Sequence, residues 1–512
     1  MRDLTVRAIA TPRVARLPLA FLAGLALAMG AAPYELWAVA LLGLVGAFWI
    51  FIALGPRRRA FLTGWAVGFG YFVFSLGWIT EPFQVDAAVT GWMAPFALVL
   101  MAAGLGLFWG AAFWAAARSP RPLIALVVLW CAAEMARGYL LTGFPWGMVG
   151  YLWAPVPAIQ WVSVVGSYGL TFLTLDLAAV LAVALHGRDR RMLALGAAGF
   201  VLLLGGGLWL TPAPQDLSER PVVRLVQPNA PQDQKWNPEM VPVFFDRQLR
   251  LTGQPVAGGL PAPSLVVWPE TALPWLLHRA REPLDMVSEA AGDVPVALGI
   301  QRRDEDGRYY NSMVLMQGDG SITETYDKHH LVPFGEYMPA ASLFAHVNIS
   351  GLAQRAASGY SAGPGPQLID LGVLGTALPL ICYEAVFPQD VGGAPGRADL
   401  LLHLTNDAWF GTWSGPYQHL SQSRIRAIEQ RLPMLRAANT GVSAVIDGGG
   451  RVIAQRGLGE AGVVDARVPP PMAPSFYATT GDLPFFLLLL VLIAAVFVPN
   501  GRIPIDPRLN RP

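Results

Sequence analysis

Cysteine and charge are both scarce in this chain. Only two cysteines, Cys131 and Cys382, occur among its 512 residues, and they fall in regions of very different texture, so a disulfide framework is excluded. Charged residues make up 14% of the chain, against roughly 25% in soluble domains. Hydrophobic residues reach 54%. The composition therefore predicts a membrane protein.

Two classes of function lack their usual signals. The net charge is +1 and no basic tract is interleaved with aromatics, which sets nucleic-acid binding aside. No metal-ligand spacing occurs: His329 and His330 adjoin each other, so their side chains point in different directions, and no ligand set surrounds them. We therefore expect no nucleic-acid partner, no metal and no cofactor.

Long apolar runs fill the first part of the chain and recur at its end. Each approaches the length of about 17–25 residues that crosses a bilayer as a helix. Eight spans are predicted, at residues 14–31, 36–54, 60–80, 92–117, 122–142, 160–185, 192–211 and 483–499.

Arginines are confined to alternate loops between these runs. Both terminal tails carry them, as do the loops near 57–59, 118–121 and 188–191, whereas the other loops contain no Lys or Arg. By the positive-inside rule both termini are cytoplasmic, and the segment 212–482 lies outside after an odd number of spans. The first run also fits a cleavable signal peptide, and cleavage would leave the segment on the same side.

Three charged residues fall inside predicted spans. Glu134 and Arg137 share a helix face three residues apart, which favours a structural ion pair over a functional one. Asp176 stands alone, and we expect it to hydrogen-bond between helices.

The segment 212–482 has the sequence pattern of an α/β domain. Short runs rich in Val, Leu and Ile are bounded by turn residues, as in buried strands. The predicted strands are 222–227, 264–268, 294–300, 312–316, 400–404 and 442–446. Helices are predicted at 283–291 and 417–431, and strands alternating with helices imply a sheet covered by helices. The predicted domains are a bundle of seven spans at 1–211, this domain, and a final span with a cytoplasmic tail at 483–512.

Three strand ends of the α/β domain present reactive groups. They are the carboxyl of Glu270, the ammonium of Lys328 and the thiol of Cys382. The thiolate is the nucleophilic form of cysteine, so a neighbouring carboxylate is needed to accept its proton. An ammonium can stabilise the oxyanion that follows attack on a carbonyl. Together the three groups suffice for acyl transfer, although each has an ordinary alternative, which for a buried cysteine is core packing.

Several short motifs carry a family resemblance. They are Trp268-Pro269-Glu270, the run from Lys328 to Glu336, Cys382-Tyr383-Glu384, the run 404–410 and the run 436–441. They resemble the carbon-nitrogen hydrolase (nitrilase) superfamily with its Glu-Lys-Cys triad. With the membrane spans and the motif at 142–146, nearly the whole chain resembles the apolipoprotein N-acyltransferase family.

This resemblance implies an αββα sandwich on the periplasmic face of a bacterial inner membrane. The implied reaction moves an acyl chain from a phospholipid, expected to be phosphatidylethanolamine, through a cysteine thioester to the N-terminal amine of a diacylglyceryl-cysteine apolipoprotein. The enzyme is expected to act as a monomer.

Residue roles also follow from the resemblance. Glu270 is the general base, Lys328 the oxyanion stabiliser and Cys382 the nucleophile. Supporting roles fall to Glu336 beside the lysine and to the pair after the nucleophile, Tyr383 and Glu384. The candidate substrate contacts are Trp236, Trp275 and Trp409, each of which has packing as its alternative.

A thioester must be kept from water until the amine arrives, which predicts apolar covering loops. Candidates are 271–277, 343–364 and 409–413, with core packing as the alternative for each. Two other functions remain open on the residues alone: a membrane-anchored amidase that uses the same triad, and a transporter whose outer domain only captures ligand.

Overall fold

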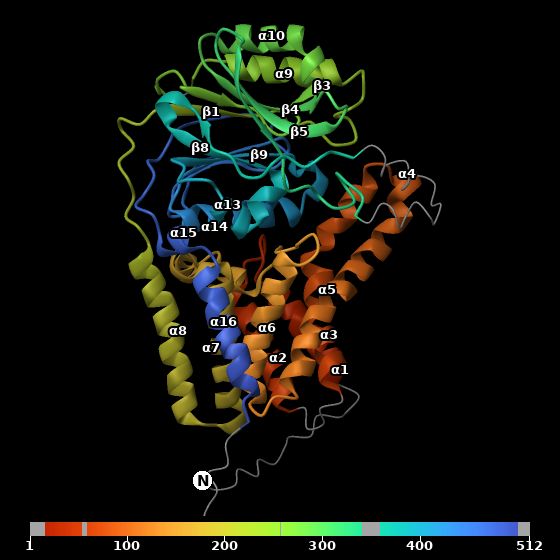
Figure 1. Ribbon diagram of the computed structural model, residues 1–512, viewed down its shortest axis with the longest axis vertical. Coiled ribbons are helices and arrows are strands. Elements are labelled where there is room, and N and C mark those ends of the chain that lie inside the picture. Colours follow the sequence, from red (N-terminus) through yellow and green to blue (C-terminus); the bar gives the residue numbers. More distant parts are fainter. Residues whose placement is uncertain (1–15, 54–58, 257, 340–358, 500–512) are drawn as a thin grey trace, which may run out of the picture.

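A helical bundle carries an α/β sandwich on one of its ends (Figure 1). The computed structural model describes residues 16–53, 59–256, 258–339 and 359–499. The bundle contains α1 (Arg16–Ala28), α2 (Trp37–Ile52), α3 (Ala60–Ser75), α5 (Ala94–Ala116), α6 (Pro122–Tyr139), α7 (Val162–Gly187), α8 (Arg190–Leu210) and α16 (Leu483–Phe497). The shorter η2 (Gly77–Gln84), α4 (Ala87–Thr90) and η3 (Gly91–Met93) join α3 to α5.

Each predicted span overlaps one of these eight bundle helices. By length and composition, four helical stretches of the described residues could cross a membrane: Ala87–Ala116, Pro122–Tyr139, Pro157–Gly187 and Arg190–Leu210. A fifth would consist of α3 and η2, which meet at a bend of 46°. The helices α1, α2 and α16 are apolar but shorter. Four or five crossings are thus supported, and the full set of eight stays a prediction.

The charged residues of the bundle behave differently from one another. Arg137 and Glu134 form a buried ion pair at 2.9 Å, as expected. Arg137 also donates to the carbonyls of Phe144 and Trp146, which ties the loop after α6 to the helix. The expectation for Asp176 was wrong: its side chain is exposed on α7, and no hydrogen bond joins it to another described residue.

The sandwich contains two mixed sheets. The first has the order β13-β1-β2-β4-β5-β6, with β3 paired to β4. Its strands are β1 (Val222–Gln227), β2 (Leu265–Val267), β3 (Leu273–Leu276), β4 (Val296–Arg303), β5 (Tyr309–Met316), β6 (Ile322–Asp327) and β13 (Gly462–Arg467). The second has the order β12-β11-β10-β9-β8-β7. Its strands are β7 (Ile369–Asp370), β8 (Thr376–Ile381), β9 (Leu400–Thr405), β10 (Met434–Ala438), β11 (Ser443–Ile446) and β12 (Val452–Arg456).

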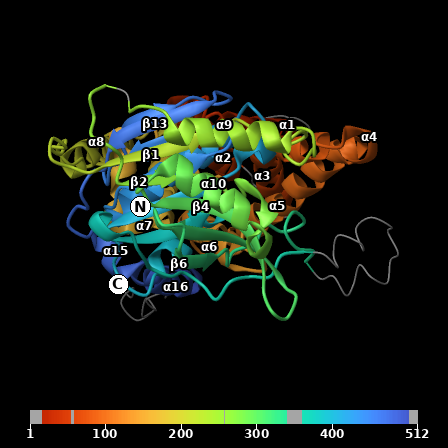
Figure 2. The same ribbon diagram turned by 90° about the horizontal axis from the view of Figure 1, so that it is seen from above.

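Successive side chains along a strand point to opposite faces of its sheet and so pack into different layers of the sandwich. In β2 the side chains of Leu265 and Val267 enter the core between the sheets, whereas Val266 faces the outer core. That outer face is covered by α9 (Val241–Gly253) and α10 (Arg281–Ala291), which lie at the top of Figure 1 and nearest the viewer in Figure 2, where the molecule is seen from above. The second sheet is covered by α13 (Pro388–Gly392) and α14 (Gly415–Gln430) on the side of the bundle. The layers form the expected αββα sandwich.

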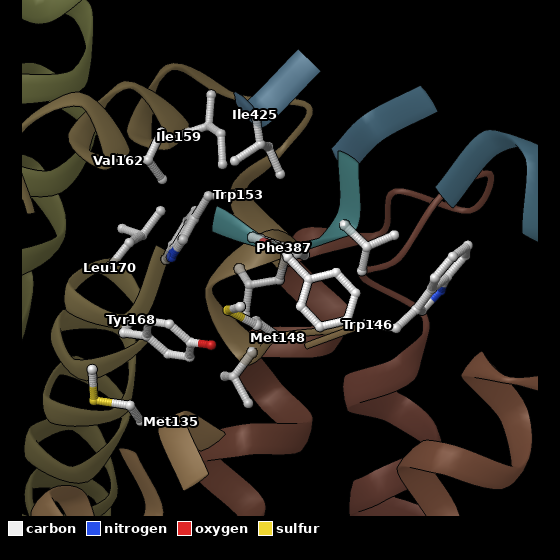
Figure 3. Close-up of a cluster of buried hydrophobic side chains, with 14 of the residues drawn as sticks. Met135, Trp146, Met148, Trp153, Ile159, Val162, Tyr168, Leu170, Phe387 and Ile425 are labelled. Atoms are coloured by element: carbon white, nitrogen blue, oxygen red, sulfur yellow. The ribbon is translucent and has the colours of Figure 1, made fainter. Parts of the chain in front are cut away.

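The sandwich rests on the outer loops of the bundle through a mixed interface. Phe387 and Ile425 of the sandwich lie in one apolar cluster with Trp153 and Met148 of the bundle (Figure 3). The indole of Trp146 donates to Gln418 at 2.7 Å. Buried apolar contact of this kind, reinforced by hydrogen bonds, holds the sheets at a fixed height above the helices.

The three candidate covering loops have different outcomes. The segment 271–277 contains β3, and Leu273 is fully buried in the outer core, which is the packing alternative. Most of 343–364 lies outside the described residues. In 409–413, Trp409 and Trp413 are exposed while Phe410 packs on Trp78 and Trp146 of the bundle.

Candidate active site

Strands of both sheets end at one edge of the sandwich, and the predicted triad lies there. Glu270 follows β2, Lys328 follows β6, and Cys382 follows β8. β2 runs parallel to β4. β6 has the same direction as β4, because both strands are antiparallel to β5. The strands β2 and β6 therefore end on the same side of the sheet. The second sheet contributes its parallel strands β8, β9 and β10. The two sheets therefore supply reactive groups to a single site.

Both carboxylate oxygens of Glu270 are held. Oε1 accepts from Asn311 at 2.8 Å and from Lys328 at 3.3 Å. Oε2 accepts the backbone N–H of Asn406 at 2.9 Å. Gly299 on β4 passes directly behind the Glu270 backbone, where an added Cβ would lie 2.7 Å from the Cα of Glu270. Only glycine permits this close approach, which fixes the turn after β2.

Lys328 lies between two carboxylates. Its Nζ is 2.8 Å from Oε1 of Glu336 and 3.3 Å from Oε1 of Glu270, and its side chain is buried. Burial alone would lower the pKa of Lys328, but Glu336 and Glu270 raise it well above its ordinary value. The ammonium is therefore charged at neutral pH. Glu336 occupies the place expected for it beside the lysine.

Cys382 begins the short helix η8 (Cys382–Val386) in a left-handed backbone conformation, with φ of 50°. Such a conformation is strained for a residue with a side chain and is common at functional sites. Burial and the Glu270 carboxylate raise the pKa of the Cys382 thiol, while Lys328 and a hydrogen bond with Thr405 oppose the shift. The resting thiol is therefore protonated.

The two residues after Cys382 support the site from outside it. Glu384 is fully buried, and its carboxylate accepts from Ile381 N, from His329 N and from the hydroxyl of Tyr326. It thereby joins the end of β8 to the segment after β6. The hydroxyl of Tyr383 reaches in the other direction, donating to the carbonyl of Gly143 in the bundle at 3.3 Å.

Three site residues were not predicted. Asn311 on β5 bridges Glu270 and Glu336, donating to the latter at 3.0 Å. Asn406 was part of a family motif without an assigned role. Lys235 donates to the carbonyl of Glu270 at 3.2 Å and to Thr271 Oγ1 at 2.8 Å. It adjoins Trp236, which was the one available signal for it.

The three candidate tryptophans lie in different surroundings. Trp236 and Trp409 are each about two-fifths exposed, at 43% and 40%. Trp275 packs edge-on against Phe245 at 5.1 Å in the outer core of the first sheet. The exposed pair is free to contact a substrate, whereas Trp275 is engaged in packing.

The arrangement has the parts needed for acyl transfer. A thiol, a carboxylate and an ammonium meet at one edge, and the ammonium also contacts a second carboxylate. Among the described residues, no group of three or more His, Cys, Asp or Glu side chains is placed to hold a metal ion.

Two known protein families match this chain, each over a different part of it. Residues 23–180 match the family described as apolipoprotein N-acyltransferase N-terminal domain, and residues 244–476 match the carbon-nitrogen hydrolase family. An amidase of the nitrilase superfamily from Nesterenkonia, a solved structure, aligns with a TM-score of 0.36 at 16% identity, covering 54% of this chain and 99% of that one.

Relatives of nearly the same length carry one description. The apolipoprotein N-acyltransferase of Rhodopseudomonas palustris is 39% identical over 510 residues, covering 94% of this chain and 95% of the relative. That of Caulobacter vibrioides is 39% identical over 511 residues, covering 95% and 94%. With identity at this level over almost the full length of both chains, the protein belongs to the apolipoprotein N-acyltransferase family.

Proposed function

We propose that Cys382 carries the acyl group as a thioester in the N-acylation that the family performs in lipoprotein maturation. The observation that supports this role is the placement of Lys328 between Glu270 and Glu336. From there its charge opposes the rise in the pKa of the Cys382 thiol that burial causes. The proposed donor is a phospholipid, phosphatidylethanolamine being expected, and the proposed acceptor is the α-amine of a diacylglyceryl-cysteine apolipoprotein.

In the first half-reaction, Glu270 takes the thiol proton as Sγ attacks the ester carbonyl of the phospholipid. The oxyanion of the tetrahedral intermediate is stabilised by the Lys328 ammonium, an interaction worth about 3–4 kcal/mol when one such donor is removed. The carbon–oxygen bond to glycerol then breaks. Glu270 returns the proton to the departing alkoxide, so a lysophospholipid leaves and the thioester remains.

In the second half-reaction the roles repeat with a different nucleophile. The α-amine of the acceptor attacks the thioester carbonyl, and Glu270 accepts a proton from the amine. The carbon–sulfur bond breaks, the amide forms, and the thiolate is reprotonated by Glu270. Because water would compete with the amine, burial of Cys382 favours transfer over hydrolysis.

The proposed topology follows the predicted domains. Residues 1–211 would form seven spans, 212–482 the periplasmic catalytic domain, and 483–512 the last span and a cytoplasmic tail, with both termini cytoplasmic. The loop 142–158, which lacks Lys and Arg, contacts the sandwich through Trp146, which supports that assignment. We further propose that the enzyme acts as a monomer, and that Trp236 and Trp409 contact substrate.

A labelled-donor experiment tests the thioester. Purified protein is incubated with a phospholipid labelled in its acyl chain, and the adduct is located by intact and peptide mass spectrometry. We expect a hydroxylamine-sensitive adduct on Cys382 that persists until a diacylglyceryl lipopeptide amine is added. Cys382→Ala should abolish it, whereas Cys131→Ala is the matched control, because that thiol is buried in α6. Release of free fatty acid without adduct or amide would instead support the amidase alternative.

A further inference from the structure

Two buried histidines bind the carbonyl oxygen of the nucleophile itself. Nε2 of His403, on β9, lies 3.1 Å from the Cys382 carbonyl, and Nε2 of His419, on α14, lies at the same distance. Both side chains are fully buried. One backbone oxygen of the strained residue is thus held by two rings from two different elements.

The partners of each ring determine where its protons are. Nδ1 of His403 faces Nη1 of Arg436 at 2.9 Å. Arginine only donates, so this nitrogen must accept, and the single ring proton lies on Nε2, directed at Cys382. His419 has Nδ1 at 2.9 Å from Oδ1 of Asp407 and Nε2 at the Cys382 carbonyl. The carboxylate and the carbonyl both only accept, so the two bonds together require a proton on each ring nitrogen. Burial and Arg436 lower the pKa of His419, whereas its bonds to Asp407 and to the Cys382 carbonyl oppose that shift.

The rings are themselves fixed from behind. Arg436 forms a buried ion pair with Asp407, and both side chains are fully buried. Although burial opposes ionisation, Arg436 and His419 lower the pKa of Asp407 to about 2, so it remains a carboxylate. The two histidines therefore cannot turn without breaking a charged network in a low-dielectric interior.

Holding this carbonyl also holds the next amide. A trans peptide is planar, and its C=O and N–H point in opposite directions. With the Cys382 carbonyl drawn toward the two rings, the N–H of Tyr383 must point away from them. Tyr383 is the second residue of η8, where an amide has no acceptor within the helix. That N–H is thus available to an oxyanion formed at the carbon bonded to Sγ.

We infer that His403 and His419 are positioning residues that orient the Cys382–Tyr383 peptide, so that the Tyr383 N–H and Lys328 together stabilise the oxyanion. This inference rests on the proposed thioester chemistry. Both histidines bond to the Cys382 carbonyl oxygen rather than to Sγ. They act through the peptide plane, and their removal should slow acylation more than it slows reactions of the thiol that form no oxyanion.

The test replaces each histidine by Gln or by Asn, whose side-chain amides extend to different distances from the backbone. Gln places its amide nitrogen near the position of Nε2, whereas Asn places it near Nδ1, too short to reach the Cys382 carbonyl. We measure the rate of thioester formation from a labelled phospholipid, the rate of Cys382 alkylation by iodoacetamide, and the unfolding temperature. The exposed His278 supplies the control, as His278→Asn.

We expect His403→Asn and His419→Asn each to slow thioester formation by about 10- to 100-fold, part of the loss seen when one oxyanion donor is removed. Alkylation should stay within about twofold because it forms no oxyanion. The Gln variants should recover most of the acylation rate. Equal rates for the Asn and Gln variants of a folded protein would overturn the inference, as would equal losses of alkylation and acylation. An absent adduct in the unmodified protein would instead refute the thioester proposal.

Discussion

The backbone N–H of Asn406 donates to Oε2 of Glu270 at 2.9 Å, across the gap between the two sheets. Asn406 follows β9, the neighbour of the strand that ends at Cys382, whereas Glu270 belongs to the first sheet. The proposed base is therefore aligned by the same sheet that delivers the nucleophile. A shift of one sheet against the other would disturb both groups together.

Glu270→Gln should remove the base while keeping the shape of the site. Glutamine retains an oxygen for the Asn406 amide but cannot accept the thiol proton. We expect thioester formation to fall by about 10²- to 10⁴-fold, the usual contribution of general base catalysis. Pre-steady-state labelling with a phospholipid measures this rate. Glu239→Gln, at an exposed position, should change nothing, and a wild-type rate in Glu270→Gln would assign the base elsewhere.

Glu336→Gln should weaken the orientation of Lys328. The ammonium would lose the closer of its two carboxylates, so its pKa should fall from its raised value. Because the Glu270 partner remains, we expect a loss of about 1–3 kcal/mol of stability rather than unfolding. Acylation should fall with it. Thermal unfolding in detergent and acylation rates check this. Both the stability and the acylation rate of Glu336→Asp should lie between those of the unmodified protein and of Glu336→Gln. Unchanged stability would show that Glu336 is not a structural partner of the lysine.

Because of His329, the stability of the sandwich should fall as the pH becomes alkaline. Burial opposes its protonation, but Asp390 and Glu384 raise the pKa of His329 to about 9. A raised pKa contributes stability fully below the ordinary value of about 6.5, and that contribution is lost as pH rises through about 9. Allowing for partial solvent screening, the contribution is about 2 kcal/mol.

The comparison with His329→Gln isolates this contribution. The difference in unfolding temperature between the unmodified protein and the variant should be largest at about pH 6.5 and below. The difference should shrink toward zero above pH 9, because His329, with a pKa of about 9, then loses its proton in the folded protein. His278→Gln is the matched control because its ring is exposed. A difference that persists unchanged at high pH would mean that packing of the ring, not its charge, is what matters.

Much of the sandwich follows from local patterns in the sequence. The run 222–227 coincides with β1, since six buried residues bounded by turn residues leave few alternatives. Strand β12 was missed because its side chains alternate between partly buried and exposed, without a continuous apolar run. The segment 271–277 was expected to cover the site because its apolar residues do not reveal which surface they meet.

The site was foreseeable only where chemistry and family motif coincide. Glu270, Lys328 and Cys382 each follow a strand and carry a reactive group, so their type and place were both informative. Asn311 lies inside β5 and has no distinctive neighbours, and its role depends on contacts with residues that follow other strands of the first sheet. The same holds for His403 and His419, whose shared partner is a backbone oxygen that no side-chain pattern records.

The acylation rate should decline at alkaline pH because Lys235 loses its proton. Burial lowers the pKa of Lys235 to about 8, while Glu270 and Cys382 oppose that shift. The side chain is thus charged at neutral pH and loses its charge above about pH 8, which removes a cation from the neighbourhood of the thiol. We expect acylation to decline with an apparent pKa near this value. Lys235→Met should be slower at neutral pH and should lack the inflection.

Stability gives an independent check on Lys235. The unfolded chain keeps the lysine proton up to its ordinary pKa of about 10.4, whereas the folded protein releases it earlier. Stability should therefore rise with pH between these values in the unmodified protein, and Lys235→Met should lack that rise. Unfolding measured from pH 7.5 to 10 tests the sign. Identical slopes in both proteins would place the lysine in water rather than in the site.

The last prediction concerns the ion pair inside the bundle. Arg137 binds Glu134 and also donates to the carbonyls of Phe144 and Trp146. The indole of Trp146 in turn donates to Gln418 of the sandwich. Arg137→Leu would leave Glu134 buried without its cation, at a cost of about 3–5 kcal/mol. Replacing both residues by Leu removes that unpaired charge, so the double variant should be more stable than Arg137→Leu alone.

The double variant also separates stability from function. The loop carbonyls of Phe144 and Trp146 remain without the Arg137 donor in it, so the loop after α6 should stay misplaced even when folding is restored. We therefore expect the double variant to recover most of its unfolding temperature but less of its acylation rate. Full recovery of both would mean that the pair serves only the packing of the bundle. Because the hydroxyl of Tyr383 also bonds to this loop, at Gly143, the loss should appear in thioester formation rather than in substrate affinity.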